Sequence, residues 1–156
     1  MKPIDSLNQV AEFHKTFQHP IEKHPIIPSR KRCDLRLALI QEELNELKEA
    51  ITHNDIVEIA DALCDIQYVL SGAVLEFGMG EKFRDLFDEV QRSNMSKVCN
   101  TEEIAVATVN HYEEHENTDC YYKKVDGKYM VYRTKDNKTL KSVDYSPADL
   151  RSILNR

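Results

Sequence analysis

Glycine is scarce in this sequence, and its scarcity excludes the commonest ways of cradling a nucleotide. The 156 residues include four glycines, none of them before Gly72. A P-loop or a dinucleotide-binding turn needs clustered glycines directly after a strand, so that backbone N–H groups can surround phosphate oxygens. Here only Gly78 and Gly80 lie close together. If the protein handles phosphates, it does so without a glycine cradle.

Proline is also missing from most of the chain, and the charge is unevenly distributed. No proline stands between Pro28 and Pro147, and long stretches free of proline and glycine favour helices. The formal net charge of −6 divides into −11 for residues 1–119 and +5 for residues 120–156. An acidic body with a basic tail is a poor general nucleic-acid binder, so no nucleic-acid polymer is expected as a partner. The lysines of the tail could still attract an anionic ligand.

The four cysteines stand far apart, and no two of them form a CxxC pair. This spacing favours free, mostly structural thiols, with Cys64 in the core. The N-terminus lacks the pattern of a signal peptide, and acidic residues interrupt the longer apolar segments. We therefore expect a cytoplasmic protein with no membrane partner.

Hydrophobic spacing predicts a mainly α protein. Apolar residues recur at steps of three and four, as in Leu37, Ile40 and Leu44, which is the period of one helix face. The pair Asp126-Gly127 between two tyrosine-rich runs predicts a β-hairpin. We expect a single domain, in which a helical bundle over residues 1–100 carries an extension over residues 101–156 with a small C-terminal hairpin. The expected helices cover residues 7–17, 33–52, 56–77, 81–93 and 102–115, the strands cover 121–125, 128–134 and 140–143, and a last helical turn starts at Pro147.

Acidic residues occur at helical spacing on two neighbouring predicted helices. Glu43 and Glu46 lie three residues apart on one side of the first helix. On the second helix, Glu58, Asp61 and Asp65 share one face. The second helix is otherwise almost wholly apolar, so we expect it to be central and buried on most sides. Three like charges on a buried helix are unfavourable unless a cation neutralises them.

A divalent metal ion is the economical source of that positive charge. The two helices offer only Arg36, which points the same way as the acids, and Lys48, which points elsewhere. Antiparallel helices joined by a short turn bring their inward side chains together, and carboxylate oxygens suit Mg²⁺ or Mn²⁺. Beside this site Asp65 and Tyr68 are candidates for substrate contact, although an ordinary packing role fits Tyr68 as well. The predicted metal ligands are Glu43, Glu46, Glu58 and Asp61.

These residues carry a resemblance to a known superfamily. Residues 42–46 read EExxE, and after a spacer of eleven residues 58–61 read ExxD. Residues 93–97 (SNMSK) and the tail segment DNKTLKSVDYSPADL extend the likeness. Together they resemble the all-α nucleoside triphosphate pyrophosphohydrolases, which include the MazG proteins, the dimeric dUTPases and the phosphoribosyl-ATP pyrophosphohydrolases. Residues 101–135 resemble nothing in that superfamily.

The resemblance implies hydrolysis of a (deoxy)nucleoside triphosphate to the monophosphate and pyrophosphate, with the four carboxylates as magnesium ligands. It places Glu42 beside the attacking water and Asn94 and Lys97 on the phosphates. By their charge, Arg92 and the basic cluster Arg30, Lys31, Arg32 and Arg36 are candidates for further phosphate contacts, and a solvated surface role fits each of them as well. Members of the superfamily usually pair protomers, so we expect a homodimer whose sites use both chains. Two alternatives stay open: a phosphoribosyl-ATP pyrophosphohydrolase, and a non-catalytic helical module whose acidic face docks a basic partner.

Overall fold

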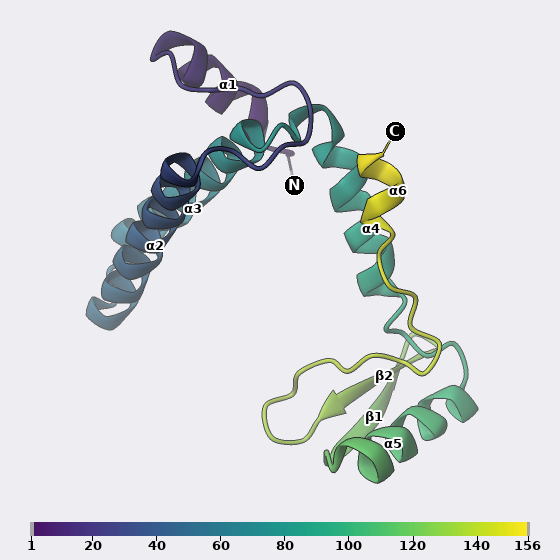
Figure 1. Ribbon diagram of the computed structural model, residues 1–156. Helices are drawn as coiled ribbons and strands as arrows, with labels where there is room; N and C mark the ends of the chain where they lie inside the picture. Colours follow the sequence, from purple (N-terminus) through teal and green to yellow (C-terminus); the bar gives the residue numbers. More distant parts are fainter. Residues whose placement is uncertain (1, 156) are drawn as a thin grey trace. The chain divides into compact units, whose positions relative to one another are not determined.

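The computed structural model describes residues 2–155 and divides the chain into two compact units (Figure 1). The N-terminal unit runs to Phe83 and the C-terminal unit starts at Arg84, so the helix after residue 80, which the sequence groups with the core, belongs to the second unit. The predicted class is confirmed, a mainly helical chain with a two-stranded hairpin near its C-terminus. The first unit holds α1 (Ser6–Thr16), α2 (Arg30–His53), α3 (Ile56–Glu76) and the 3-10 turn η1 (Gly80–Lys82), and the second holds α4 (Phe83–Met95), α5 (Glu102–Glu116), β1 (Cys120–Val125), β2 (Lys128–Arg133) and α6 (Leu150–Leu154).

In the N-terminal unit, α2 and α3 form an antiparallel hairpin and α1 packs against α3 (Figure 1). The turn between α2 and α3 is the one that the sequence predicts. Asn54 ends α2 with a left-handed φ of 54°, and the side chain of Asp55 accepts hydrogen bonds from the backbone N–H groups of Val57 and Glu58. This N-cap satisfies donors that the first turn of α3 leaves free, and the short turn aligns the two helices.

The proline-rich loop before α2 crosses the end of α3. The backbone N–H of Glu22 donates to the carbonyl of Leu75 at 3.0 Å, and that of Ile26 donates to the carbonyl of Phe77 at 3.1 Å. Gly78 allows this crossing, because it has a φ of +68° and a Cβ there would lie 1.8 Å from a backbone oxygen of the loop. Helix α2 then begins at Arg30, three residues earlier than predicted, with Ser29 at its N-cap position.

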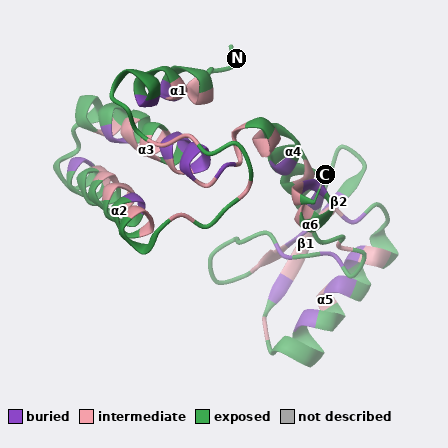
Figure 2. Cartoon of the chain, turned by 45° about the horizontal axis from the view of Figure 1, so that its top comes forward, coloured by how far each residue is buried: buried purple, intermediate pink, exposed green. Residues whose placement is uncertain are grey.

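The expected burial of α3 on most sides is wrong for its N-terminal half. Ile56 is 73% exposed, Val57 70% and Leu63 53%, whereas the segment from Ser71 to Glu76 is almost wholly buried (Figure 2). Helix α1 covers only the C-terminal half, where the amide of Gln67 donates to the Ser6 hydroxyl at 3.3 Å. Helices α1 and α2 therefore leave much of the N-terminal half of α3 in contact with solvent, although this half is strongly apolar.

In the C-terminal unit, α5 packs against one face of the β1–β2 hairpin. Asp126 and Gly127 both have positive φ, 50° and 77°, which suits the tight turn predicted there. The expected third strand over residues 140–143 is not a strand: the described chain has an isolated bridge between Tyr132 and Thr139 instead. The core of this unit consists of Cys99, Ala105, Tyr112, Cys120, Tyr129, Val131 and Leu140.

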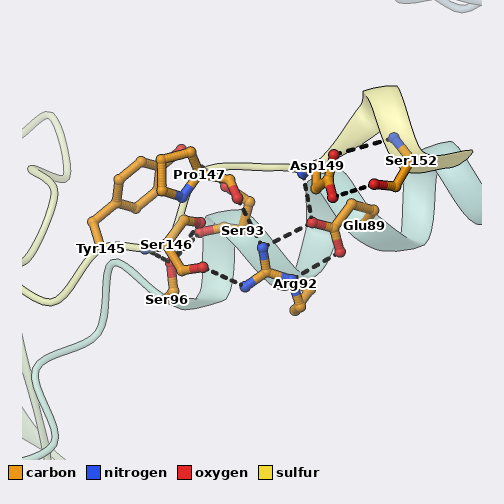
Figure 3. Close-up of polar contacts among 9 residues, drawn as sticks. All are labelled: Glu89, Arg92, Ser93, Ser96, Tyr145, Ser146, Pro147, Asp149 and Ser152. Carbon is orange, nitrogen blue, oxygen red and sulfur yellow. Dashed lines mark hydrogen bonds and ion pairs between the residues drawn. The ribbon is translucent and has the colours of Figure 1, made fainter.

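The C-terminal tail lies along α4 (Figure 3). The last helix begins at Leu150, and not at Pro147 as expected, because the carboxylate of Asp149 caps it by accepting from the backbone N–H of Ser152. The cysteines are free, as predicted, but Cys64 is exposed on α3 and does not belong to the core. No single helix within residues 2–155 is long and apolar enough to cross a membrane; only α3 and α4 counted together across the break between them reach that length and hydropathy.

Candidate functional site

A pocket of about 480 Å³ lies within the N-terminal unit, between α1, α2 and α3. Its lining falls into four groups: a set of rings, two arginines, two carboxylates, one from each helix of the hairpin, and four aliphatic side chains. Helix α1 and the loop after it form the side of the pocket opposite that hairpin. The lining residues are Val10, Phe13, His14, His19, Arg32, Leu35, Arg36, Leu39, Glu43, Asp65, Tyr68 and Val69.

The rings form an aromatic wall. The ring of Phe13 meets that of Tyr68 edge-on at 5.6 Å between centroids and stacks on His19 at 5.8 Å. Tyr68 is 39% exposed, so its ring lines the pocket and is not sealed in the core. The sequence indicated Tyr68 by its helical spacing. It gave no signal for Phe13 and His19, because tertiary packing of α1 brings them there.

A buried carboxylate, Glu76, anchors the cationic side of the pocket. It is 1% exposed and accepts from the guanidinium groups of Arg32 and Arg36. Burial alone would raise the pKa of Glu76, but the hydrogen bonds and charges of the two arginines outweigh it, so this pKa is lowered. Arg36, predicted as a phosphate ligand, is itself buried in this network, and its Nε has no hydrogen-bond partner in the described chain.

His14 completes the network in a neutral form. Its Nδ1 lies 2.8 Å from the carbonyl oxygen of Pro20 and its Nε2 lies 3.3 Å from Nη2 of Arg36. A carbonyl can only accept and a guanidinium can only donate, so Nδ1 carries the proton and Nε2 accepts. Burial is the main cause that lowers the pKa of His14. A histidine alone on a short helix gave no sequence signal for this role.

The carboxylates of α2 and α3 approach one another at the pocket. Glu43 and Asp65 both line it. The pKa of Glu43 is raised, first by loss of solvent around it and then by the negative charges of Asp65, Glu46, Glu42 and Asp61. Acids from both helices therefore act on one carboxylate.

A ready metal centre is not formed, however. Within residues 2–155, no three histidine, cysteine, aspartate or glutamate side chains stand close enough to hold an ion. Glu42, Glu46, Glu58 and Asp61 are exposed, whereas Glu43 and Asp65 are half-buried. The four-carboxylate ligand set thus stays a prediction, and the structure adds Asp65 as the acid that shares the pocket with Glu43.

The remaining predicted residues belong to the C-terminal unit, where neighbours engage them. Arg92 forms a two-pronged pair with Glu89 at 2.8 Å for both bonds, and it also donates to the Ser146 hydroxyl and to the carbonyl of Pro147 (Figure 3). The pair with Arg92 holds the pKa of Glu89 at about 2. Lys97 donates from Nζ to the side-chain oxygen of Asn94 at 2.8 Å. Arg92 therefore holds the tail on α4, while Asn94 and Lys97 are partners of each other.

A comparison with protein families assigns the part of the chain that contains this site to a family. The sequence profile described as phosphoribosyl-ATP pyrophosphohydrolase matches residues 10–94, more than half of the chain. The chain belongs to this family. The matched part of this pyrophosphohydrolase-family protein begins in α1 and ends in α4, so it contains the whole pocket. The α5–hairpin region lies outside the match.

A second comparison finds a full-length relative of this family member. An uncharacterized protein of Acanthamoeba polyphaga mimivirus is 26% identical, and the alignment covers 93% of this chain and 94% of the relative. The likeness therefore extends through the α5–hairpin region as well. Membership in the family also places the chain in the all-α superfamily that its EExxE and ExxD segments resemble.

Proposed function

We propose that the protein hydrolyses a (deoxy)nucleoside triphosphate to the monophosphate and pyrophosphate in a Mg²⁺-dependent reaction, for which Mn²⁺ can substitute. One observation carries this proposal: a single pocket of about 480 Å³ combines an aromatic wall with carboxylates from two helices. Rings suit a nucleobase, and carboxylates tolerate a triphosphate only through divalent cations. We expect this reaction to serve nucleotide housekeeping in the cytoplasm.

The carboxylate oxygens at the pocket are suitable ligands for a divalent cation. Oxygen ligands are those that Mg²⁺ prefers. The pKa of Glu43 is raised first by loss of solvent and then by the neighbouring carboxylates, and a cation bound there would offset this negative charge. Glu43 and Asp65, together with Glu46, Glu58 and Asp61, would hold the metal. When bound, it supplies charge neutralisation at the phosphates and lowers the pKa of a coordinated water.

The chain's own residues would bind and orient the substrate. The base would stack against Phe13 and Tyr68, while the Arg32 side of the pocket favours negative charge. In the reaction a water oxygen bonds to the α-phosphorus, the bond from that phosphorus to the bridging oxygen breaks, and pyrophosphate leaves. Glu42, next to Glu43 on α2, would accept the proton of the attacking water.

Phosphoribosyl-ATP is the second candidate substrate. The observation that favours it is the match of residues 10–94 to the family profile of that name. Phosphoribosyl-ATP also carries a triphosphate on a purine nucleoside, so the same pocket chemistry applies to it. A substrate panel separates the two candidates.

The decisive experiment measures products across that panel. The protein is incubated with the common NTPs, dNTPs and phosphoribosyl-ATP, with Mg²⁺, with Mn²⁺ and with neither, and monophosphate and pyrophosphate are quantified. We expect turnover only with metal, and a loss of at least about tenfold in Glu43→Gln and Asp65→Asn, the loss that even outer-sphere metal partners cause. The exposed Glu49→Gln on α2 is the matched control. No turnover of any substrate would favour the non-catalytic helical module instead.

We infer that a second copy of the chain covers the exposed apolar edge of the α2–α3 hairpin. In each helix one edge of the apolar stripe is half-buried against the neighbouring helix, and the other edge is exposed. Residues seven apart on a helix form the seam of helix–helix association. The exposed residues at that spacing are Leu37, Leu44 and Ile51 on α2 and Ile56, Leu63 and Leu70 on α3.

Light scattering tests the dimer directly. One chain has a mass of 18.1 kDa, so we expect twice that mass in solution. Leu44→Glu and Leu63→Glu should shift the protein to monomer, because each would bury an unpaired charge in the interface. Ile27→Glu, exposed in the loop before α2, should leave the mass unchanged. A monomeric wild-type protein would contradict this inference.

A further inference from the structure

The β1–β2 hairpin has one face turned away from α5. Side chains alternate between the two faces of a strand, and the face toward α5 carries Cys120, Tyr129 and Val131, which are buried in the core. The opposite face, which we call the outer face, carries the alternate residues. Its members are Tyr121, Lys123, Val125, Lys128, Met130 and Tyr132.

Two tyrosines stand side by side on the outer face. Tyr121 and Tyr132 are direct cross-strand partners, and their ring centroids are 5.8 Å apart. The Tyr121 hydroxyl donates to the side-chain oxygen of Asn137 at 2.6 Å, and Nζ of Lys123 lies 5.4 Å from the centre of the Tyr121 ring. These contacts hold two half-buried rings in one fixed platform.

The charge around this platform is strongly positive and unneutralised. Residues 120–143 hold seven basic and two acidic side chains, and one of those acids, Asp136, pairs with Arg133. Helix α5, which packs against the other face of the hairpin, carries five acidic residues and no lysine or arginine. Within the described chain no ion pair neutralises the lysines of this stretch, which are Lys123, Lys124, Lys128, Lys135, Lys138 and Lys141.

We propose that the outer face of the hairpin binds single-stranded nucleic acid, a function separate from hydrolysis in the N-terminal unit. Aromatic rings on which bases stack, flanked by lysines that contact the backbone phosphates, are the elements of sequence-tolerant binding to single strands. Tyr121 and Tyr132 supply the stacking surface, and Lys123 and Lys128 lie beside it on the same face.

The same observations disfavour other anionic partners. An acidic peptide would use the lysines but would leave the paired rings without a role. A membrane surface would require an apolar tip, whereas the tip of this hairpin is Asp126-Gly127, with Val125 as its exposed apolar neighbour. Phosphates joined to flat bases match both the charge and the rings.

This proposal reverses the expectation, drawn from the net charge of −6, that no nucleic-acid polymer binds. The net charge of a chain sums over all of its surfaces, whereas a ligand contacts only one of them. Three of the six lysines lie on the hairpin and three in the segment that follows it, and all belong to a different unit of the chain from α2 and α3. The charge of this face, and not the net charge of the chain, therefore governs what the face attracts.

Fluorescence anisotropy of the full-length protein with labelled 20-mers of dT and rU tests the proposal. We expect binding at 50 mM NaCl that weakens steeply at 200 mM, and a salt slope that falls by about one for each of Lys123→Gln and Lys128→Gln. Tyr132→Ala should weaken binding about tenfold. Lys48→Gln, exposed on α2, is the matched control and should bind as the wild type does.

Three outcomes would overturn the proposal: no binding to either strand at 50 mM NaCl, unchanged binding in both Tyr132→Ala and Lys123→Gln, or binding of anionic vesicles or polyglutamate with equal affinity through the same lysines. Far-UV circular dichroism checks that each variant is folded, and Lys123→Gln serves as the second variant, since its side chain is exposed. Nucleotide hydrolysis should be unchanged in all of these variants, so the proposed activity and the proposed binding fail or stand independently.

Discussion

Replacing Glu76 with glutamine tests how the N-terminal unit is held together. Glu76 is 1% exposed, and its partners differ: the side chain of Arg36 is 9% exposed, whereas that of Arg32 is 27% exposed. Glutamine keeps the size and one acceptor oxygen but removes the charge. Arg36 is then left as a buried cation without a counter-ion, while water can partly solvate Arg32.

The expected loss in the free energy of unfolding follows from this asymmetry. Removing one partner of a buried ion pair costs about 3–5 kcal/mol. Because only Arg36 is fully deprived of solvent, we expect the lower end, about 3 kcal/mol. For a unit of this length, that corresponds to a fall in melting temperature of roughly 12–24 °C.

Hydrogen exchange of the α2 and α3 amides measures this loss within the N-terminal unit, and urea unfolding followed by circular dichroism measures it for the chain. Arg30→Gln is the control on the same helix, because it breaks the exposed Arg30–Asp34 pair and should leave stability unchanged within error. A loss below about 1 kcal/mol in Glu76→Gln would refute the reasoning that a buried charge network joins these helices.

Three further predictions follow from single contacts. The pKa of His14 is lowered in the folded protein, so its contribution to stability is fully present above pH 6.5 and is lost as the pH falls below that value. The melting temperature should therefore drop more between pH 7.5 and 5.5 in the wild type than in His14→Gln. Equal drops in the two proteins would contradict this prediction. Gly78→Ala should lose more stability in urea unfolding than Gly127→Ala, since both residues have positive φ but only at residue 78 would the added Cβ lie 1.8 Å from a backbone oxygen. Arg92→Lys should speed proteolysis between residues 145 and 150, because lysine cannot reproduce the four hydrogen bonds of the guanidinium; an unchanged cleavage rate would argue against that anchoring role.

Features that depend on neighbouring residues were predictable from the sequence. The Asp55 cap and the Asp126-Gly127 turn are local chemistry, so they appear where they were expected. Helical spacing and one short turn also suffice to place Glu43 near acids of α3, whereas the four-carboxylate ligand set stays a prediction.

Features that depend on packing were not predictable. Phe13 and His14 reach the pocket only because α1 packs against α3, and nothing in their own spacing indicates that. The sequence predicts more burial for the N-terminal half of α3 than the structure shows. An apolar helix face indicates that the face packs against a partner, but it does not indicate whether that partner is another part of the same chain. The carboxylate partners of Arg36 and Arg92 are not predictable either, because a free cation and a paired one look alike in sequence, and their role as phosphate ligands stays a prediction.

Product stoichiometry during a metal titration tests the central claim most directly. A nucleoside triphosphate that turns over in the substrate panel is incubated with wild type and Glu43→Gln while Mg²⁺ is raised from zero. Our account predicts equal amounts of monophosphate and pyrophosphate, none without metal, and a curve shifted to higher Mg²⁺ in the variant. Release of a nucleoside diphosphate with orthophosphate, or turnover that is independent of metal and of Glu43, would contradict it.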